Sequence, residues 1–188
     1  MQTLFPVEPQ YPEGFLYLPD FISVAEEAML YQEAVQLERH TFAFQGYEAK
    51  RKVASFGYDW SFEKQQLTRG KDIPAPFLPL IEKVAQRLAI PTNQFAELLV
   101  TEYPIGAVIN WHRDAPPFDL IAGISLQSDC TFRLRPFDKA KQHRSNILSF
   151  PVKRRSLYVM QGLARTEWQH SIAAVKQVRY SITLRTLK

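Results

Sequence analysis

The half of the sequence that follows Phe95 consists of short apolar stretches separated by turn-forming residues, and this pattern constrains the fold most. Each stretch has the length of one strand, and no helical periodicity interrupts them. The predicted strands are Glu97–Tyr103, Val108–Arg113, Leu120–Leu126, Thr131–Arg135, Asn146–Phe150, Ser156–Met160, Glu167–Ile172 and Arg179–Leu187. Successive short strands of this kind are typical of β-sandwiches and barrels. We therefore predict a mainly β fold with a core over about residues 95–188.

The preceding residues predict two helices and a hairpin arm that support this β core. Ser23 and Glu26 have the spacing of a capping box, which begins an amphipathic helix that runs to about Arg39. A second amphipathic helix is expected over about Pro76–Leu88. Between them, Arg51–Trp60 alternates like a strand. At 188 residues the chain suits a single domain over residues 1–188.

Cysteine content and hydropathy narrow the cellular setting. The single cysteine, Cys130, excludes a disulfide framework within the chain and favours a reducing compartment. The sequence has no apolar run of the length that a transmembrane helix requires. We therefore expect a cytoplasmic protein that does not enter a membrane, and the sequence gives no sign of an obligate protein partner.

The charge is mildly basic, with a formal net charge of +4 and a pI of about 9.2. This balance permits a polyanionic partner such as nucleic acid without requiring one. The basic residues form clusters at Lys50–Lys52, Arg133 with Arg135, Lys139–Arg144 and Lys153–Arg155. Solvated loops are the alternative interpretation of each cluster.

Three residues have the types and spacing of a metal site. His112 and Asp114 lie two residues apart at the end of a predicted strand, so their side chains point to the same face. His170 lies on another predicted strand. Two histidines and one carboxylate form the facial triad of non-haem iron(II) oxygenases, which leaves metal positions open for a co-substrate and oxygen. A zinc hydrolase could use the same ligands, and a surface ion pair with an unrelated strand histidine is a further alternative.

The last predicted strand carries two arginines on one face. Tyr180, Ile182 and Leu184 form its apolar face, whereas Arg179, Ser181, Thr183 and Arg185 form the other face. Arginines that point into a barrel are costly unless an anion neutralises them. The two arginines lie about 20 Å apart along the strand, and their long side chains could bracket a small dicarboxylate. This strand favours an oxygenase over a zinc hydrolase, although an exposed edge strand is the alternative.

These motifs together resemble the AlkB family of 2-oxoglutarate-dependent dioxygenases. The matching segments are Gly14–Phe21, Tyr103–Gly106, Asn110–Asp114, Gln169–Ile172 and Arg179–Arg185. The resemblance implies a double-stranded β-helix, or jelly roll, that holds iron(II) with His112, Asp114 and His170. It implies 2-oxoglutarate and O2 as co-substrates, with oxidative decarboxylation to succinate and CO2.

The resemblance also implies roles for residues around the co-substrate. Arg179 would bind the distal carboxylate of 2-oxoglutarate, Arg185 would lie near the metal-side carboxylate, and Tyr103 would donate a hydrogen bond. The family has asparagines where this sequence has Thr101 and Ser181, whose hydroxyls can replace those contacts.

The family resemblance makes oxidative demethylation of N-alkylated bases in DNA or RNA the leading hypothesis, with single strands preferred. In the family a hairpin before the barrel covers the nucleotide, and Arg51–Trp60 occupies that place. We predict that this segment contacts the substrate through Arg51, Lys52, Phe56, Tyr58 and Trp60. The last four share one parity, which suits base stacking beside a phosphate contact. Alternatively, the aromatic residues pack against the first helix.

Pro116 keeps a second hypothesis open. It stands where the bacterial repair enzyme of the family has an acidic contact to the damaged base. A hydroxylase or demethylase of a protein or small molecule is therefore the alternative. A non-catalytic binding module that kept the fold is a third hypothesis, which the intact triad and both arginines disfavour.

Overall fold

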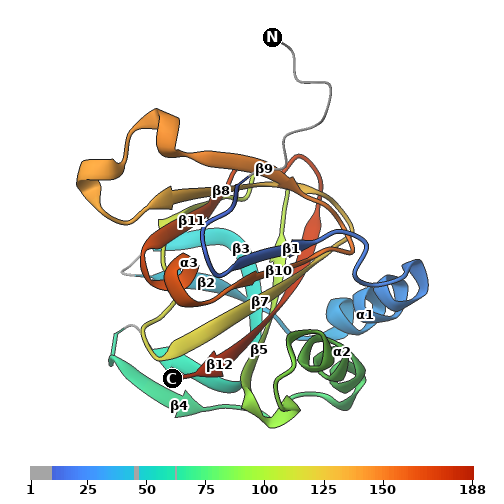
Figure 1. Cartoon of the computed structure of the whole chain (residues 1–188). Coiled ribbons are helices and arrows are strands. Elements are labelled where there is room, and N and C mark those ends of the chain that lie inside the picture. Colours follow the sequence, from blue (N-terminus) through green and yellow to red (C-terminus); the bar gives the residue numbers. More distant parts are fainter. Residues whose placement is uncertain (1–9, 45–46, 62) are drawn as a thin grey trace.

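The computed structural model describes residues 10–44, 47–61 and 63–188, and its strands form two facing sheets (Figure 1). The larger, eight-stranded sheet has the order β1-β10-β7-β12-β5-β3-β2, with β4 paired to β3, and the smaller has the order β6-β11-β8-β9. The strands of the larger sheet are β1 (Phe15–Leu18), β2 (His40–Phe44), β3 (Tyr47–Ser61), β4 (Gln66–Arg69), β5 (Phe95–Tyr103), β7 (Phe118–Leu126), β10 (Leu157–Met160) and β12 (Arg179–Leu187). Those of the smaller sheet are β6 (Ile109–His112), β8 (Cys130–Pro136), β9 (Leu148–Val152) and β11 (Trp168–Ile172). All strand pairings among the described residues are antiparallel, and the predicted mainly β fold is confirmed.

The eight predicted strands correspond to β5–β12, with ends that differ by at most two residues. Sequence reasoning missed the short strands β1, β2 and β4, and also the helix α3 (Gly162–Thr166) between β10 and β11. Strands β1, β2 and β4 have only four or five residues each, too few for alternation to be recognised.

Helices α1 (Val24–Gln36) and α2 (Leu78–Leu88) cover the outer face of the larger sheet (Figure 1). The predicted capping box is present, since Ser23 Oγ accepts from the Glu26 N–H and the Glu26 carboxylate accepts from the Ser23 N–H. Leu30 of α1 and Val84 of α2 are buried in one apolar cluster with residues of the sheet. Burying a side chain of this size contributes roughly 1.5–3 kcal/mol.

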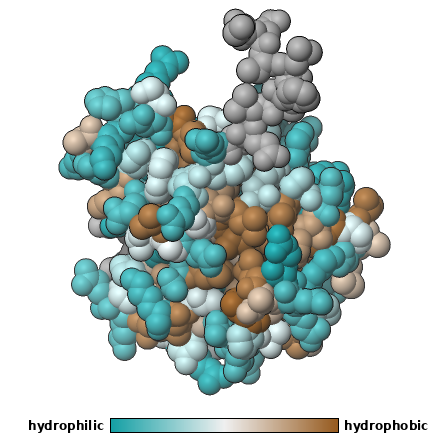
Figure 2. Space-filling view, viewed as in Figure 1, coloured by the Kyte–Doolittle hydropathy of each residue, from teal (hydrophilic) through white to brown (hydrophobic). Residues whose placement is uncertain are grey.

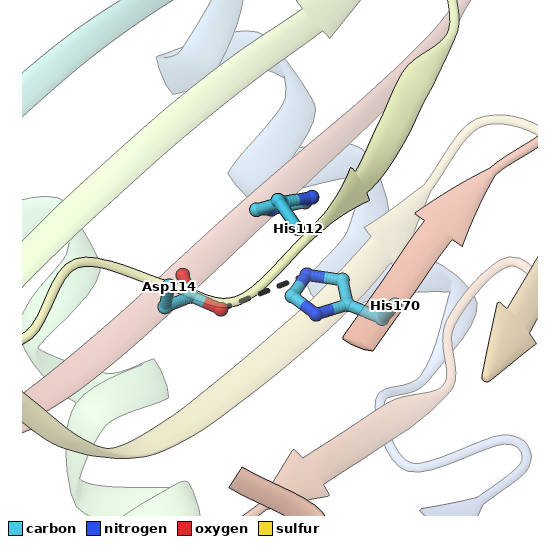
Figure 3. A group of neighbouring side chains, drawn as sticks. All are labelled: His112, Asp114 and His170. Atoms are coloured by element: carbon cyan, nitrogen blue, oxygen red, sulfur yellow. Dashed lines mark ion pairs between the residues drawn. The ribbon is translucent and has the colours of Figure 1, made fainter. Parts of the chain in front are cut away.

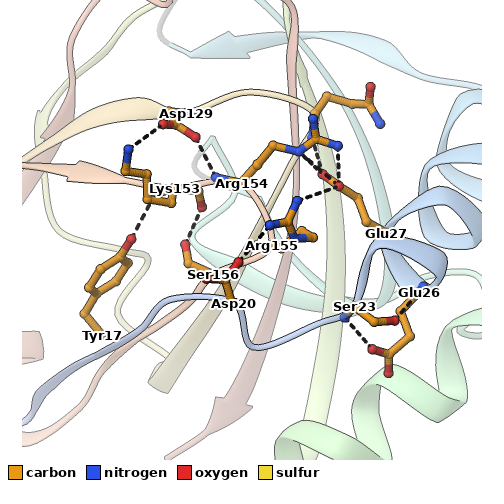
Figure 4. A network of polar contacts seen from close by, with 11 residues as sticks. Tyr17, Asp20, Ser23, Glu26, Glu27, Asp129, Lys153, Arg154, Arg155 and Ser156 are labelled. Carbon is orange, nitrogen blue, oxygen red and sulfur yellow. Dashed lines mark hydrogen bonds and ion pairs between the residues drawn. The ribbon is translucent and has the colours of Figure 1, made fainter.

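A buried carboxylate attaches α1 to the end of the sheet (Figure 4). Glu27 is 1% exposed and accepts hydrogen bonds from Arg154 Nη2 at 2.5 Å and from the Gln127 N–H at 2.8 Å. Next to it, Arg155 pairs with Asp20 at 2.8 Å. Lys153 pairs with Asp129 at 3.3 Å, so all three members of the basic cluster Lys153–Arg155 pair with acidic groups in the fold.

A second apolar cluster fills the space between the sheets, and β12 separates it from the helix side. The predicted apolar face of β12, which consists of Tyr180, Ile182 and Leu184, packs in the helix-side cluster. The opposite face of β12 points towards the smaller sheet, which contributes Phe132, Ile172 and other buried side chains. The polar residues of β12 therefore lie in the interior. No helix in the described part of the chain is both long and apolar enough to cross a bilayer.

Candidate metal centre

The structure brings the three predicted metal ligands together at the open end of the space between the sheets (Figure 3). His112 ends β6, Asp114 follows in the next loop, and His170 lies on β11 directly opposite His112. One ligand atom from each residue lies within 4.8 Å of the others. The register of β6 and β11 shifts between the His112–His170 pair and the Ile109–Ile172 pair. Because of this shift, the side chains of Ile109 and His112 both line the cavity described below.

The electrostatic environment keeps both imidazoles available as metal ligands. Burial, together with the nearby His112, lowers the pKa of His170 to about 3, and burial also lowers the pKa of His112. A neutral imidazole has one nitrogen lone pair to offer a metal. His112 Nδ1 lies 2.8 Å from the Asn110 carbonyl oxygen, and a proton on Nδ1 leaves Nε2 as the ligand atom.

Asp114 is held by an arginine that leaves one of its oxygens unoccupied. Arg185 donates from Nε and Nη2 to Asp114 Oδ1, at 3.0 and 2.7 Å. Asp114 Oδ2 is buried without a hydrogen-bond partner in the described structure and lies 3.6 Å from His170 Nε2. Burial would raise the pKa of Asp114, but Arg185 and the two histidines outweigh it, so this pKa lies well below its ordinary value. A divalent cation fits this oxygen and the neighbouring imidazoles.

Sequence reasoning missed Glu97, which neutralises Arg185 from the other side. Glu97 lies opposite Arg185 in the β5–β12 register, is 2% exposed and pairs with the Arg185 guanidinium. Burial raises the pKa of Glu97, although Arg185 opposes this. The sequence signal that could have identified Glu97 is an acidic residue within the mainly apolar strand β5. Arg185 therefore has two protein carboxylates as partners, and its charge needs no anionic ligand for neutralisation. Its position near the metal-side carboxylate of 2-oxoglutarate stays a prediction.

Arg179 differs from Arg185 because no described carboxylate pairs with it. It is 0% exposed, its Nε donates to Ser125 Oγ at 3.0 Å, and its guanidinium lies 4.8 Å from the centre of the Tyr103 ring. Neither Nη atom has a hydrogen-bond partner among the described residues. A buried, unpaired guanidinium is costly, and an anionic ligand such as a carboxylate would fit it.

The other predicted co-substrate residues lie close by. Tyr103 pairs with Arg179 in the register of β5 and β12, and Ser181 Oγ donates to the Tyr103 hydroxyl at 3.4 Å. Thr101 is buried opposite Ser181 on β5. Sequence reasoning missed Tyr158, whose phenol is buried on the same side and whose pKa is raised by that burial.

An arginine that sequence reasoning missed holds the backbone of the metal loop. Arg165 of α3 is buried, and its Nη2 donates to three carbonyl oxygens, those of Asp114, Ala115 and Phe118, at 2.8–3.1 Å. In the opposite direction, Arg113 Nη1 donates to the carbonyl of Thr166 at 2.7 Å. These contacts fasten the loop after His112 to α3. These hydrogen bonds depend on helix α3, which no local sequence pattern predicted.

The triad opens into a cavity of about 440 Å³ between the two sheets. Its inner wall includes Tyr103, Tyr158 and the ligands themselves, whereas β2, β3 and the following turn form its outer rim. The rim residues are His40, Phe42, Arg51, Val53, Ser55, Asp59, Trp60, Ser61 and Glu63. The space suffices for a small dicarboxylate and part of a larger substrate.

The structure separates the five residues predicted to contact substrate. Arg51 and Trp60 line the cavity, but Phe56 is buried in the helix-side core, Lys52 is exposed, and Tyr58 borders a different surface hollow. The prediction of one shared face is therefore wrong. Its cause is Gly57, where φ is +83° and β3 stops pairing with β5 and starts pairing with β4. This bend breaks the alternation, so Trp60 faces the cavity and Phe56 does not.

Residues 14–185 match the model of a family described as the 2OG-Fe(II) oxygenase superfamily. The chain belongs to this superfamily. The metal of this oxygenase is iron(II), and its co-substrates are 2-oxoglutarate and O2. The β core of the chain has the double-stranded β-helix fold that the sequence predicts. The buried Asp114 Oδ2 and the unpaired Arg179 guanidinium fit a metal ion and an anionic co-substrate, so the site itself agrees with membership.

The relatives of this oxygenase confirm the resemblance to the AlkB family. The chain is 27% identical over 180 residues to the Arabidopsis thaliana alkylated DNA repair protein ALKBH8 homolog. It is 28% identical over 189 residues to the Bos taurus DNA oxidative demethylase ALKBH2. These alignments use 85% and 87% of this chain, but only 50% and 65% of the relatives. The chain thus spans about half to two thirds of their length.

Solved structures agree on the fold of this oxygenase. The OsALKBH1 structure superposes with a TM-score of 0.73 at 14% identity, covering 94% of this chain and 99% of the other. A Pseudomonas putida prolyl-4-hydroxylase superposes with a TM-score of 0.64 at 15% identity, covering 93% and 92%. At this identity the superpositions show the fold alone.

Proposed function

We propose that this oxygenase removes alkyl groups oxidatively from N-alkylated bases in DNA or RNA. The observation that carries the proposal is the unpaired guanidinium of Arg179, buried beside the wall of the cavity that contains His112, Asp114 and His170. When bound, iron(II), 2-oxoglutarate and O2 supply the oxidising chemistry that hydroxylates a C–H bond, and a hydroxylated N-methyl group leaves as formaldehyde.

Each residue of the site has a distinct part in this proposal. His112, Asp114 and His170 hold iron(II), and Arg185 acts through Asp114 by occupying Oδ1. Arg179 pairs with the distal carboxylate of 2-oxoglutarate, with Tyr103, Thr101 and Ser181 as polar neighbours of the co-substrate. The buried phenols and apolar residues of the wall exclude water, which strengthens the charge-assisted contacts.

Nucleic acid is the proposed substrate class for two reasons. First, two relatives of this chain are named DNA oxidative demethylases, and a third is named a tRNA (carboxymethyluridine(34)-5-O)-methyltransferase. Second, the cavity rim offers stacking groups, because the Arg51 guanidinium lies 3.9 Å from the centre of the Phe42 ring and Trp60 lines the same cavity. An extruded base can stack on such surfaces.

The cavity rim also supplies carboxylates, which can replace the acidic base contact that is missing because Pro116 stands at its position. Asp59 and Glu63 line the cavity from β3 and the turn after it. Asp59 accepts a hydrogen bond from the Trp60 N–H at 2.9 Å, which leaves its other oxygen for a ligand. We therefore infer that Arg51, Trp60 and Asp59 contact the nucleotide, and that Lys52, Phe56 and Tyr58 do not.

The experiment is to incubate anaerobically purified protein with iron(II), 2-oxoglutarate and methylated oligonucleotides, then admit O2 and measure succinate and formaldehyde. We expect methylated single strands to stimulate both products in equal amounts. Trp60→Ala should weaken oligonucleotide binding by roughly 1–3 kcal/mol, the contribution of one stacked base, and leave substrate-free succinate release unchanged. Tyr58→Ala is the matched control from the same strand and should behave like the wild type.

Pro116 favours a second candidate function, hydroxylation of a protein or small molecule. The same assay separates the two functions. If neither methylated DNA nor methylated RNA stimulates succinate release above the substrate-free rate, the nucleic-acid proposal fails and this second function replaces it.

A further inference from the structure

The outer face of the smaller sheet carries two arginines that lie against one tryptophan. Arg133 and Arg135 project from β8, and Trp111 projects from β6 on the far side of β11. Their guanidinium carbons lie 5.1 and 4.5 Å from the Trp111 ring centre. We call these three residues the arginine–tryptophan platform. His112 and His170 point to the opposite side of the same strands, into the cavity.

Side chains of the intervening strand hold the arginines in place. Arg133 Nε donates to Ser171 Oγ at 3.0 Å, and Arg135 Nε donates to the Gln169 side-chain oxygen at 2.8 Å. These bonds use one nitrogen of each guanidinium, and both arginines remain partly exposed. The fixed geometry reduces the entropy that each guanidinium would lose on binding an anion.

The positive charge of the platform is not neutralised within the described residues. No described carboxylate lies within ion-pair distance of Arg133 or Arg135, whereas Lys153, Arg154 and Arg155 all pair with acidic groups. Asp138, just beyond β8, pairs with Lys141 at 3.8 Å. Figure 2 shows hydrophilic side chains over the projecting segment between β8 and β9, which carries further basic residues.

A short path of similar groups joins the platform to the cavity. Arg113 lies two residues after Trp111, about 7 Å along extended chain, and lines the cavity. Its guanidinium lies 3.6 Å from the ring centre of Phe137, which is 43% exposed and follows Arg135 by two residues. Guanidinium forks beside an exposed ring match a phosphate backbone whose bases are free to stack.

We propose that the platform binds backbone phosphates of single-stranded nucleic acid next to the nucleotide held in the cavity. The inference rests on the proposed nucleic-acid substrate and adds a second contact region to it. Planar guanidinium forks suit phosphate, because two N–H groups can bind two phosphate oxygens together. The exposed Phe137 ring favours a single strand, whose bases are unpaired and can stack on it.

The test measures binding of an unmodified, fluorescein-labelled single-stranded oligonucleotide to metal-free protein by anisotropy, at 50–200 mM salt (about the range over which phosphate contacts are resolved). Arg133→Ala with Arg135→Ala should weaken binding roughly tenfold or more at low salt. The slope of log affinity against log salt should decrease by about 1.4, since each single-strand phosphate contact contributes about 0.7. Arg133→Lys with Arg135→Lys should keep most of the slope.

Two controls make the result specific. Lys71→Ala with Arg87→Ala removes the same charge from exposed positions away from the smaller sheet, and affinity should stay within about twofold of the wild type. Thermal unfolding of every variant checks that the fold persists; if the alanine pair unfolds, the lysine pair and Arg135→Gln alone carry the test. Unchanged affinity and slope in folded platform variants would overturn the inference.

The outcomes also separate this inference from the proposed function. If the wild type binds oligonucleotides through the platform but methylated strands do not stimulate turnover, the demethylase proposal fails and the platform remains. If methylated strands are turned over while platform variants bind them normally, the platform inference alone fails. If the wild type binds no oligonucleotide, the platform inference is overturned. Turnover of a methylated nucleoside then decides whether the demethylase proposal holds.

Discussion

Arg185 donates two hydrogen bonds to one oxygen of Asp114, from Nε at 3.0 Å and from Nη2 at 2.7 Å, and none to the other oxygen. The free oxygen, Oδ2, is the one that lies 3.6 Å from His170 Nε2. The arginine therefore sets which carboxylate oxygen is offered to the metal, and Glu97 stabilises the arginine from the other side.

Removing this support should weaken the metal site without unfolding the protein. We expect Arg185→Met to lower the affinity for Mn²⁺, measured by anaerobic calorimetry without co-substrate, by about 10–100-fold, the usual effect of losing a partner of a metal ligand. Arg185→Lys retains the charge and should lose less. Wild-type affinity in a folded Arg185→Met protein would show that Asp114 needs no such support.

Arg179 should matter for the co-substrate and not for the metal. Losing a charge-assisted pair worth roughly 1.5–3 kcal/mol should raise the 2-oxoglutarate dissociation constant of Arg179→Met by about 10–150-fold, with Mn²⁺ affinity unchanged. Titration of 2-oxoglutarate into the Mn²⁺-loaded protein measures the first value, and titration of Mn²⁺ into the metal-free protein measures the second.

The same variant tests why the arginine is there. Because its guanidinium is buried and unpaired without co-substrate, replacing it with an apolar side chain should not destabilise the ligand-free protein and can raise its melting temperature. A large loss of ligand-free stability, together with unchanged co-substrate affinity, would assign Arg179 a structural role instead.

Arg165 is expected to position the metal loop. In Arg165→Met the carbonyls of Asp114, Ala115 and Phe118 lose a shared donor. This should lower the free energy of unfolding by roughly 1–3 kcal/mol and also weaken Mn²⁺ binding. Urea unfolding and calorimetry far below the melting temperature give the two values. Arg113→Met, which loses one bond to Thr166, is the comparison and should cost less. Lost stability with full metal affinity would restrict Arg165 to a structural role.

The start of α1 should show a pH-dependent ion pair. The Lys83 ammonium, 2.7 Å from Glu26 Oε1, lowers the pKa of this carboxyl below its ordinary value, with help from the Ser23 N–H. A carboxyl whose folded pKa is depressed stabilises the fold above its unfolded pKa, and the stabilisation is lost as pH falls through the folded pKa.

Glu26→Gln keeps the capping geometry and removes the charge. Since the pair is about one-third exposed, we expect a loss of about 0.5 kcal/mol at pH 7 that disappears at a pH below the depressed folded pKa of Glu26. Urea unfolding at the two pH values measures this, and Lys83→Met should behave in the same way. A difference that stays constant between these pH values would contradict an ionic origin.

Local patterns predicted much of this protein. Short apolar stretches between turn-forming residues located eight strands, and alternation placed Tyr180 on the apolar face of β12, because a strand's two faces follow from its own sequence. The capping box at Ser23 was equally local. The ligand types and the two-residue spacing of His112 and Asp114 indicated a metal site before any fold was known.

Tertiary structure decided the features that depend on distant partners. The positive φ of Gly57 redirects β3, so Trp60 reaches the cavity and Phe56 joins the core, although both have the same parity. The two arginines of β12 lie on the same face of one strand, so the sequence alone does not distinguish them. Only the β5–β12 register and the metal loop give Arg185 two carboxylates, whereas Arg179 has none among the described residues. The reason is that neutralising a buried charge requires an opposite charge close by in space, wherever it lies in the chain.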